Sequence, residues 1–176
     1  LHGLGEALSG ENATNSSVLH RLIVQGAAMV AESHGGALYL LDRRGETLVP
    51  HYRSLASPPL IGIPAHIEEQ ARKQPSALDS YLRLTSVKAD TGILGWCLHH
   101  GPALKVDDLS EETRGGDTYS AIHEGVSAML ATLRYGEKKL GVLAVANTGM
   151  GQPFSGNDFE VFKSVAEQSA FALGTA

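Results

Sequence analysis

The side chains of this sequence best suited to chemistry are a lone cysteine and a few of its eight histidines. Because Cys97 is the only cysteine, an internal disulfide and a four-cysteine metal site are both excluded. Catalysis by disulfide exchange is also disfavoured, since it needs a second, resolving thiol. A free cysteine in an apolar segment is usually a small core residue, and we expect that role for Cys97.

The histidines that could bind a metal or a haem are the adjacent pair His99 and His100 and the isolated His123. Adjacent residues diverge on a helix and point to opposite faces of a strand, so His99 and His100 are poor joint ligands. His123 could serve as a single axial haem ligand. An ordinary hydrogen-bonded histidine is the simpler interpretation, and the sequence assigns no cofactor and no metal.

Composition limits the remaining function classes. The chain has 176 residues, of which 43% are hydrophobic and 19% charged, and this suits one globular domain with its own core. A net charge of −5 provides no broad positive field, so we expect no direct nucleic-acid partner. The single cysteine fits a reducing, cytoplasmic compartment. The sequence has no apolar run of about 18 residues and no basic-then-apolar leader, so we expect no membrane partner.

The elements that must position these side chains begin with two helical segments. Leu1, Leu4 and Leu8 recur at helical spacing, so residues 1–15 are expected to be the end of a linker helix arriving from upstream. The polar stretch 11–17 is expected to form a turn. Ser16 or Ser17 would then cap a second helix that runs to about residue 33.

The rest of the chain alternates strands and short helices. Residues 37–42 and 47–54 predict a hairpin, and residues 127–147 predict a second hairpin with central strands. The segments between them are expected to be two short helices, a short strand and loops, with no assignment for residues 74–91. Ser155 or Asn157 would cap a closing helix. This order predicts an α+β domain with an antiparallel sheet flanked by helices.

Two segments carry a resemblance to the GAF domain family: residues 92–108, and the 127–147 hairpin with the Phe154, Asp158 and apolar helix that follow it. The resemblance extends over about residues 16–173. It implies a GAF-like, PAS-related central sheet of about six antiparallel strands. The terminal helices would cover one face, and a ligand pocket on the other face would be roofed by the middle loops and short helices. Residues 16–176 would be the GAF domain, with the C-terminal helix leading to an output domain.

The resemblance also implies a function. It predicts a non-enzymatic sensor domain of a larger bacterial signalling protein, homodimeric through its terminal helices and coupled to a kinase, cyclase, phosphatase or transcription activator. A small molecule bound non-covalently under the roof would favour one packing of those helices. The residues expected to face the roof side are Tyr39, His51, Trp96, Tyr119, His123, Met129 and Ala131. A one-residue slip would replace the strand members by their neighbours.

Four alternative functions within this family can be compared with the residues of this sequence. Cyclic-nucleotide-binding members carry an Asn-Lys, Phe, Asp-Glu signature; Asn147, Phe154 and Asp158 match it, but threonine and phenylalanine replace the lysine and the glutamate. Pigment-binding members attach a bilin through a cysteine that the segment 119–123 lacks. Members that reduce free methionine sulfoxide need the second cysteine that is missing here. The remaining alternative is a ligand-free structural module that only dimerises.

Overall fold

The computed structural model describes residues 2–149 and 153–176 of the chain, with side chains described from residue 15 onward. Its α-helices are α1 (His2–Val30), α2 (Ala65–Lys73), α3 (Ser76–Leu84), α4 (Gly92–His100) and α5 (Gly156–Gly174). Its strands are β1 (Gly35–Leu41), β2 (Thr47–Arg53), β3 (Val87–Lys88), β4 (Ala103–Val106), β5 (Ser127–Tyr135) and β6 (Lys138–Asn147). Three short 3₁₀ segments, η1 (Leu109–Glu111), η2 (Arg114–Gly116) and η3 (Ala121–His123), precede β5.

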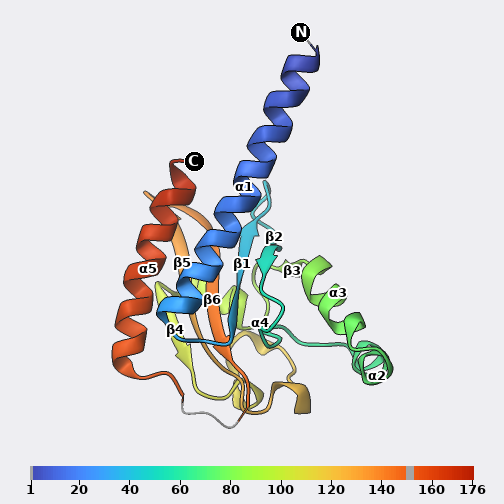
Figure 1. Ribbon diagram of the computed structural model, residues 1–176. Helices are drawn as coiled ribbons and strands as arrows, with labels where there is room; N and C mark the ends of the chain where they lie inside the picture. The colour runs from blue at the N-terminus through green and yellow to red at the C-terminus, as the bar shows by residue number, and fades with distance from the viewer. Residues whose placement is uncertain (1, 150–152) are drawn as a thin grey trace.

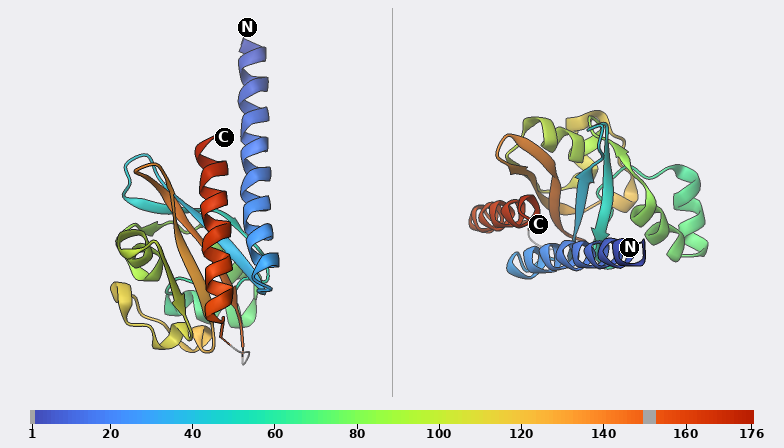
Figure 2. Two further views of the ribbon diagram at one scale, coloured as in Figure 1. Left: turned by 90° about the vertical axis from the view of Figure 1, so that its left-hand side faces the viewer. Right: turned by 90° about the horizontal axis from the view of Figure 1, so that it is seen from above.

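The six strands form one antiparallel sheet in the order β3-β2-β1-β6-β5-β4. Helices α1 and α5 lie side by side on one face, α4 and the 3₁₀ segments lie on the other, and α2 and α3 lie beside the β2–β3 edge (Figures 1 and 2). The predicted α+β architecture, with its six-stranded antiparallel sheet, is therefore confirmed. None of the described helices combines the length and the apolar character needed to cross a bilayer.

Strand alternation divides the core into two layers, one on each side of the sheet. On β6, Val142 and Ala144 pack on the roof side, whereas Leu143 and Val145 pack against the terminal helices. Both faces of this strand are fully buried from Val142 to Ala146. Successive side chains of a strand point to opposite faces, so a movement of β6 displaces both layers together.

The turn expected over residues 11–17 is wrong, because α1 is one continuous helix from His2 to Val30. Ser16 and Ser17 are exposed residues within it, not its cap. A polar stretch without proline can remain helical at a cost of only a few tenths of a kcal/mol per residue when its side chains face water. The exposed Ser16 and Ser17 therefore belong to a solvated part of this helix.

The other expected elements are present, and the unassigned stretch has structure. Both hairpins form, and residues 74–91 contain α3 and the short strand β3. Ser155 caps α5: its hydroxyl accepts from the backbone N–H of Asp158 at 3.0 Å, and the Asp158 carboxylate accepts from the backbone N–H of Ser155 at 2.8 Å. This capping box satisfies backbone donors that the first turn would leave unpaired.

Candidate functional site

The polar centre of the roof side is His123, whose side chain is fully buried at the end of η3. Its Nδ1 accepts a hydrogen bond from the backbone N–H of Ser120 at 3.1 Å, so the ring proton lies on Nε2. Nε2 then donates to the carbonyl oxygen of Ile61 at 2.7 Å. Burial lowers the pKa of His123, because it disfavours the charged imidazolium. The side chain is therefore a neutral hydrogen-bonded link between η3 and the loop before α2.

Two neighbours of His123 fasten the same segment to other parts of the roof. The Tyr119 hydroxyl accepts from the backbone N–H of Ile93, at the start of α4, at 3.2 Å. The Asp117 carboxylate accepts from the backbone N–H of Gly62 at 3.0 Å. The Tyr119 and His123 rings meet edge to face, with centroids 5.1 Å apart. We call Asp117, Tyr119 and His123 the roof clasp, because they hold residues 117–123 against the loop at 61–62 and the start of α4.

The space under the clasp is filled by the protein's own apolar side chains. Tyr39 is 2% exposed there, and burial raises the pKa of its hydroxyl to about 12. Leu48 and Leu94 pack in the same layer. Five surface hollows, with volumes of about 250 to 500 Å³, are lined by residues other than Tyr39, Tyr119 and His123. A ligand in this compartment would have to displace the roof.

Trp96 lies at the outer side of this layer. Its ring stacks on His100 at a centroid distance of 4.2 Å, and the Arg114 guanidinium lies 5.0 Å from the ring centroid. Arg114 is itself held by two hydrogen bonds to the carboxylate of Glu112, at 2.6 and 2.9 Å. Trp96 thus joins α4 to η2, and it is only partly buried.

Three residues expected to face the roof are on the opposite side of the sheet. Met129 and Ala131 pack in the core formed with α1 and α5, so the facing predicted for β5 is wrong by one residue; Ala128 and Leu130 face the roof. His51 is exposed, and its ring lies edge to face against His20 of α1 with centroids 5.1 Å apart. The structure therefore brings together only Tyr39, Trp96, Tyr119 and His123 from the predicted set.

Cys97 is a buried core residue, as expected. Its side chain is fully buried, and its Sγ lies 3.6 Å from the hydroxyl oxygen of Thr132. Burial raises the pKa of the thiol to about 11, which suppresses the nucleophilic thiolate at neutral pH. His99 and His100 are both exposed, and no group of three metal-binding side chains occurs among the residues that the structure describes.

The residues that match the cyclic-nucleotide signature stabilise the chain around the end of β6. The side-chain oxygen of Asn147 accepts from the backbone N–H of His34 at 2.7 Å, which ties β6 to the turn between α1 and β1. Phe154 is buried in the core beneath the terminal helices, and Asp158 belongs to the α5 capping box. All three side chains are engaged away from the roof compartment.

Sequence analysis missed Asp117 and an ion pair beside the roof. The Arg53 guanidinium, 7% exposed, donates to the carboxylate of Asp79 on α3 at 2.8 Å. The only local signal for Asp117 was the glycine pair before it. Its partner Gly62 is 55 residues away along the chain, and no local pattern reports such a contact.

A six-stranded antiparallel sheet, with both terminal helices on one face and a roof of short helices on the other, defines an α+β domain of the type that the sequence predicted. A family model described as GAF domain matches residues 13–174. The chain therefore belongs to the GAF domain family.

Solved structures share the fold at low identity. The second GAF domain of DevS from Mycobacterium smegmatis is 18% identical, with a TM-score of 0.62 over 90% of this chain and 92% of that one. The GAF domain/HD domain protein from Geobacter sulfurreducens is 13% identical, with a TM-score of 0.64 and the same coverages. The GAF domain of the Acinetobacter phosphoenolpyruvate-protein phosphotransferase is 18% identical, with a TM-score of 0.64 over 90% and 83%. No curated protein sequence matches this chain.

Proposed function

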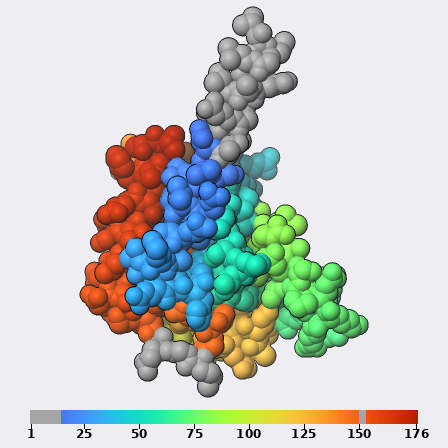
Figure 3. All heavy atoms as spheres, in the orientation of Figure 1, coloured from blue at the N-terminus to red at the C-terminus, as the bar shows by residue number. Residues whose placement is uncertain are grey.

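We propose that this domain is a regulatory sensor module whose terminal helices associate with a second copy and transmit a signal to an output domain. One observation carries the proposal. Val18, Leu22 and Met29 of α1 are 37%, 56% and 75% exposed, and their spacings of four and seven residues place them on one side of the helix. Phe171 of α5, 64% exposed, adds a large apolar side chain to the neighbouring helix. Figure 3 views the face on which α1 and α5 lie together.

An unpartnered helix pair of this kind is the usual basis of a helical dimer interface. A second copy related by a two-fold axis would bring α1 and α5 of both chains into one bundle. The same helices pack on the sheet through Phe162 and Ala166, so a change in sheet geometry reaches the interface directly. The proposed partners are therefore a second copy of the chain and a domain attached to these helices in the cytoplasm.

The signal in this proposal is a small molecule bound non-covalently on the roof side. The support is the construction of the roof: Gly115 and Gly125, on either side of the clasp, both have φ in the left-handed region, at 84° and 72°. Glycine reaches these angles without strain and so can act as a hinge. A ligand that opens the clasp would bind only the open state and would shift the population toward it.

The dimer is tested by analytical ultracentrifugation. The wild-type domain should sediment at twice its monomer mass, and Leu22→Glu/Met29→Glu should be monomeric with an unchanged circular dichroism spectrum, because both side chains face water in the monomer. Leu84→Glu is the matched control, since Leu84 is 76% exposed on α3. A wild-type monomer at every concentration, or a dimer in the double variant, would contradict the helix interface.

The sensory role is tested by native mass spectrometry of gently purified protein. An added mass that is retained on the folded species and lost on denaturation is expected. The packed roof compartment favours one alternative, a ligand-free module that only dimerises. Bare dimers, in cell extracts and after incubation with small-molecule pools, would support that alternative over ligand sensing.

A further inference from the structure

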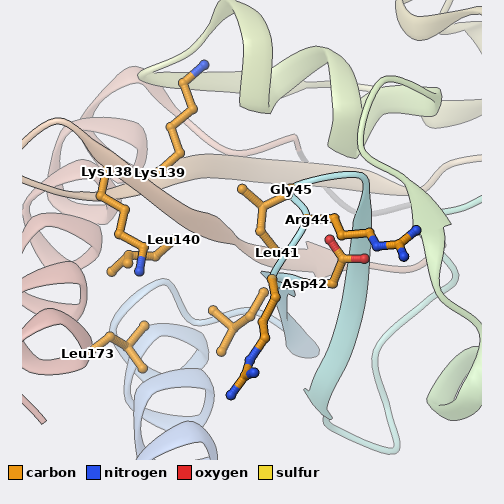
Figure 4. Close-up of a pocket in the computed structure, with 10 residues that line it drawn as sticks. Leu41, Asp42, Arg44, Gly45, Lys138, Lys139, Leu140 and Leu173 are labelled. Carbon is orange, nitrogen blue, oxygen red and sulfur yellow. The ribbon is translucent and has the colours of Figure 1, made fainter.

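A candidate site separate from the roof clasp lies between the tips of the two hairpins and the C-terminal end of α5. The hollow there has a volume of about 500 Å³, within the range of small-molecule sites. We call it the hairpin hollow, and it is lined by Leu40, Leu41, Asp42, Arg43, Arg44, Gly45, Lys138, Lys139, Leu140 and Leu173 (Figure 4).

The floor of the hairpin hollow is apolar. Leu40, Leu140 and Leu173 come from β1, β6 and α5, and all three belong to the core layer under the terminal helices, yet each remains partly exposed. The last turn of α5 packs closely on the β5–β6 hairpin, since a Cβ at Gly174 would lie 2.2 Å from the Tyr135 ring. Among the side chains that the structure describes, none covers this apolar surface completely.

The rim of the hairpin hollow is cationic. Arg43 and Lys138 are exposed, and within the described residues neither forms an ion pair with a carboxylate. Lys138 lies on the same side as Leu140, whereas Lys139 points away and donates to the carbonyl oxygen of Leu98 (Figure 4). The hollow therefore combines an apolar floor with cations at its edge.

The lining also holds one carboxylate, that of Asp42, whose negative charge is outnumbered by the cations of Arg43, Arg44, Lys138 and Lys139. Asp42 accepts hydrogen bonds from the backbone N–H of Glu46 at 2.9 Å and from the Thr47 hydroxyl at 2.9 Å, which closes the β1–β2 turn. These bonds lower the pKa of Asp42 and occupy both of its oxygens. Its role is to hold the turn that presents Arg43.

We propose that the hairpin hollow binds a small amphipathic anion, with an apolar body on the leucine floor and a single anionic head between Arg43 and Lys138. Neither part suffices alone: exposed cations hold a hydrated anion weakly, and an apolar floor does not select charge. A ligand seated here would contact β1, β6 and the last turn of α5 together. It would therefore act on the C-terminal end of α5, independently of the roof compartment.

The test is a titration of the ¹⁵N-labelled domain with decanoate, kept below its micelle-forming concentration and followed by amide chemical shifts. Saturable shifts should concentrate at residues 40–45, 138–140 and 173. Acetate, which has the head without the body, and decylammonium, which has the body with the opposite charge, should each bind at least tenfold more weakly. Equal binding of decylammonium would overturn the anionic preference, and shifts centred on another surface would overturn the site.

Charge-reversal variants distinguish specific binding by the rim cations from a non-specific effect of the net charge of the domain. Arg43→Glu/Lys138→Glu should weaken decanoate binding by about tenfold or more, since it replaces two attractions by repulsions. The matched control is Arg72→Glu/Lys73→Glu on α2, which changes the net charge equally at exposed positions outside the lining of the hollow. Equal weakening by both pairs would refute a specific rim. These measurements do not depend on the roof clasp, so their failure would leave the proposed sensory function standing.

Discussion

His123 and Ile61 are joined by a 2.7 Å hydrogen bond across 62 residues of chain, from a fully buried imidazole to a backbone carbonyl. Because the second ring nitrogen accepts from the backbone N–H of Ser120, one side chain satisfies two backbone groups of the roof. Because Nδ1 accepts the hydrogen bond from Ser120, the ring proton lies on Nε2, and Nε2 can therefore donate to Ile61.

Replacing His123 by alanine should therefore destabilise the domain strongly. The variant leaves a cavity and removes the partners of two backbone groups, for an expected loss of about 2–4 kcal/mol in the free energy of unfolding. Urea denaturation followed by circular dichroism measures it. His66→Ala is the control, because His66 is exposed on α2 and should change the stability by less than about 0.5 kcal/mol. Similar losses in both variants would contradict the bridging role of His123.

Acid should destabilise the domain through its histidines. Burial lowers the pKa values of His20, His51 and His123, and the neighbouring His51 lowers that of His20 further. The unfolded chain, with histidine pKa values of about 6.5, binds protons before the folded one does. The stability that these groups contribute is thus present above pH 6.5 and is lost as the pH falls from about 6.5 toward the lowered folded values.

The His20–His51 contact gives this pH dependence a specific test. Two imidazolium rings at a centroid distance of 5.1 Å would repel each other between α1 and β2. His51→Gln should therefore reduce the slope of unfolding free energy against pH between about 6.5 and 5. A slope unaltered by His51→Gln would exclude the pair as a source of acid sensitivity.

Gly141 is required by the close approach of β6 to β1. A Cβ at this position would lie 2.0 Å from the carbonyl oxygen of Tyr39, and this neighbour is backbone that cannot rotate away. Gly141→Ala should cost about 2 kcal/mol or more and lower the melting temperature by several degrees. Gly156→Ala is the control: nothing lies within 4 Å of its Cβ position at the start of α5, so its effect should be neutral or slightly stabilising. Equal melting temperatures for the two variants would contradict the steric argument.

Element types were predictable from the sequence wherever a periodic pattern and a local stop signal coincide. The capping box at Ser155 and the two hairpins are of this kind. The facing of β5 was not predictable, because Met129 and Leu130 are both fully buried on opposite sides of the sheet. A strand covered on both faces carries no alternation of polarity, so its sequence contains no information about phase.

At the candidate site too, some residues could be predicted from the sequence and others could not. His123 and Tyr119 were identified as roof residues because they lie on the segment that the family resemblance places there. Their partners at Ile61 and Ile93 were not identifiable, since both bonds end on backbone atoms distant in sequence. His51 was misplaced because a bulge interrupts the β1–β2 ladder at this point: Pro50 pairs with Tyr39 and Tyr52 with Leu38, so His51 has no partner on β1. Its ring lies against His20 of α1 and not under the roof.

Cys97 should be unreactive in the folded domain. The thiol is fully buried, and its pKa of about 11 leaves a very small thiolate fraction at pH 8. Reaction with Ellman's reagent should therefore be slow in buffer and become fast and stoichiometric in denaturing urea. Its rate in buffer should follow the unfolding equilibrium, so a destabilising variant such as Gly141→Ala should accelerate it. A rapid reaction in the wild-type domain under native conditions would instead reveal an accessible nucleophile and reopen thiol chemistry as a function of this fold.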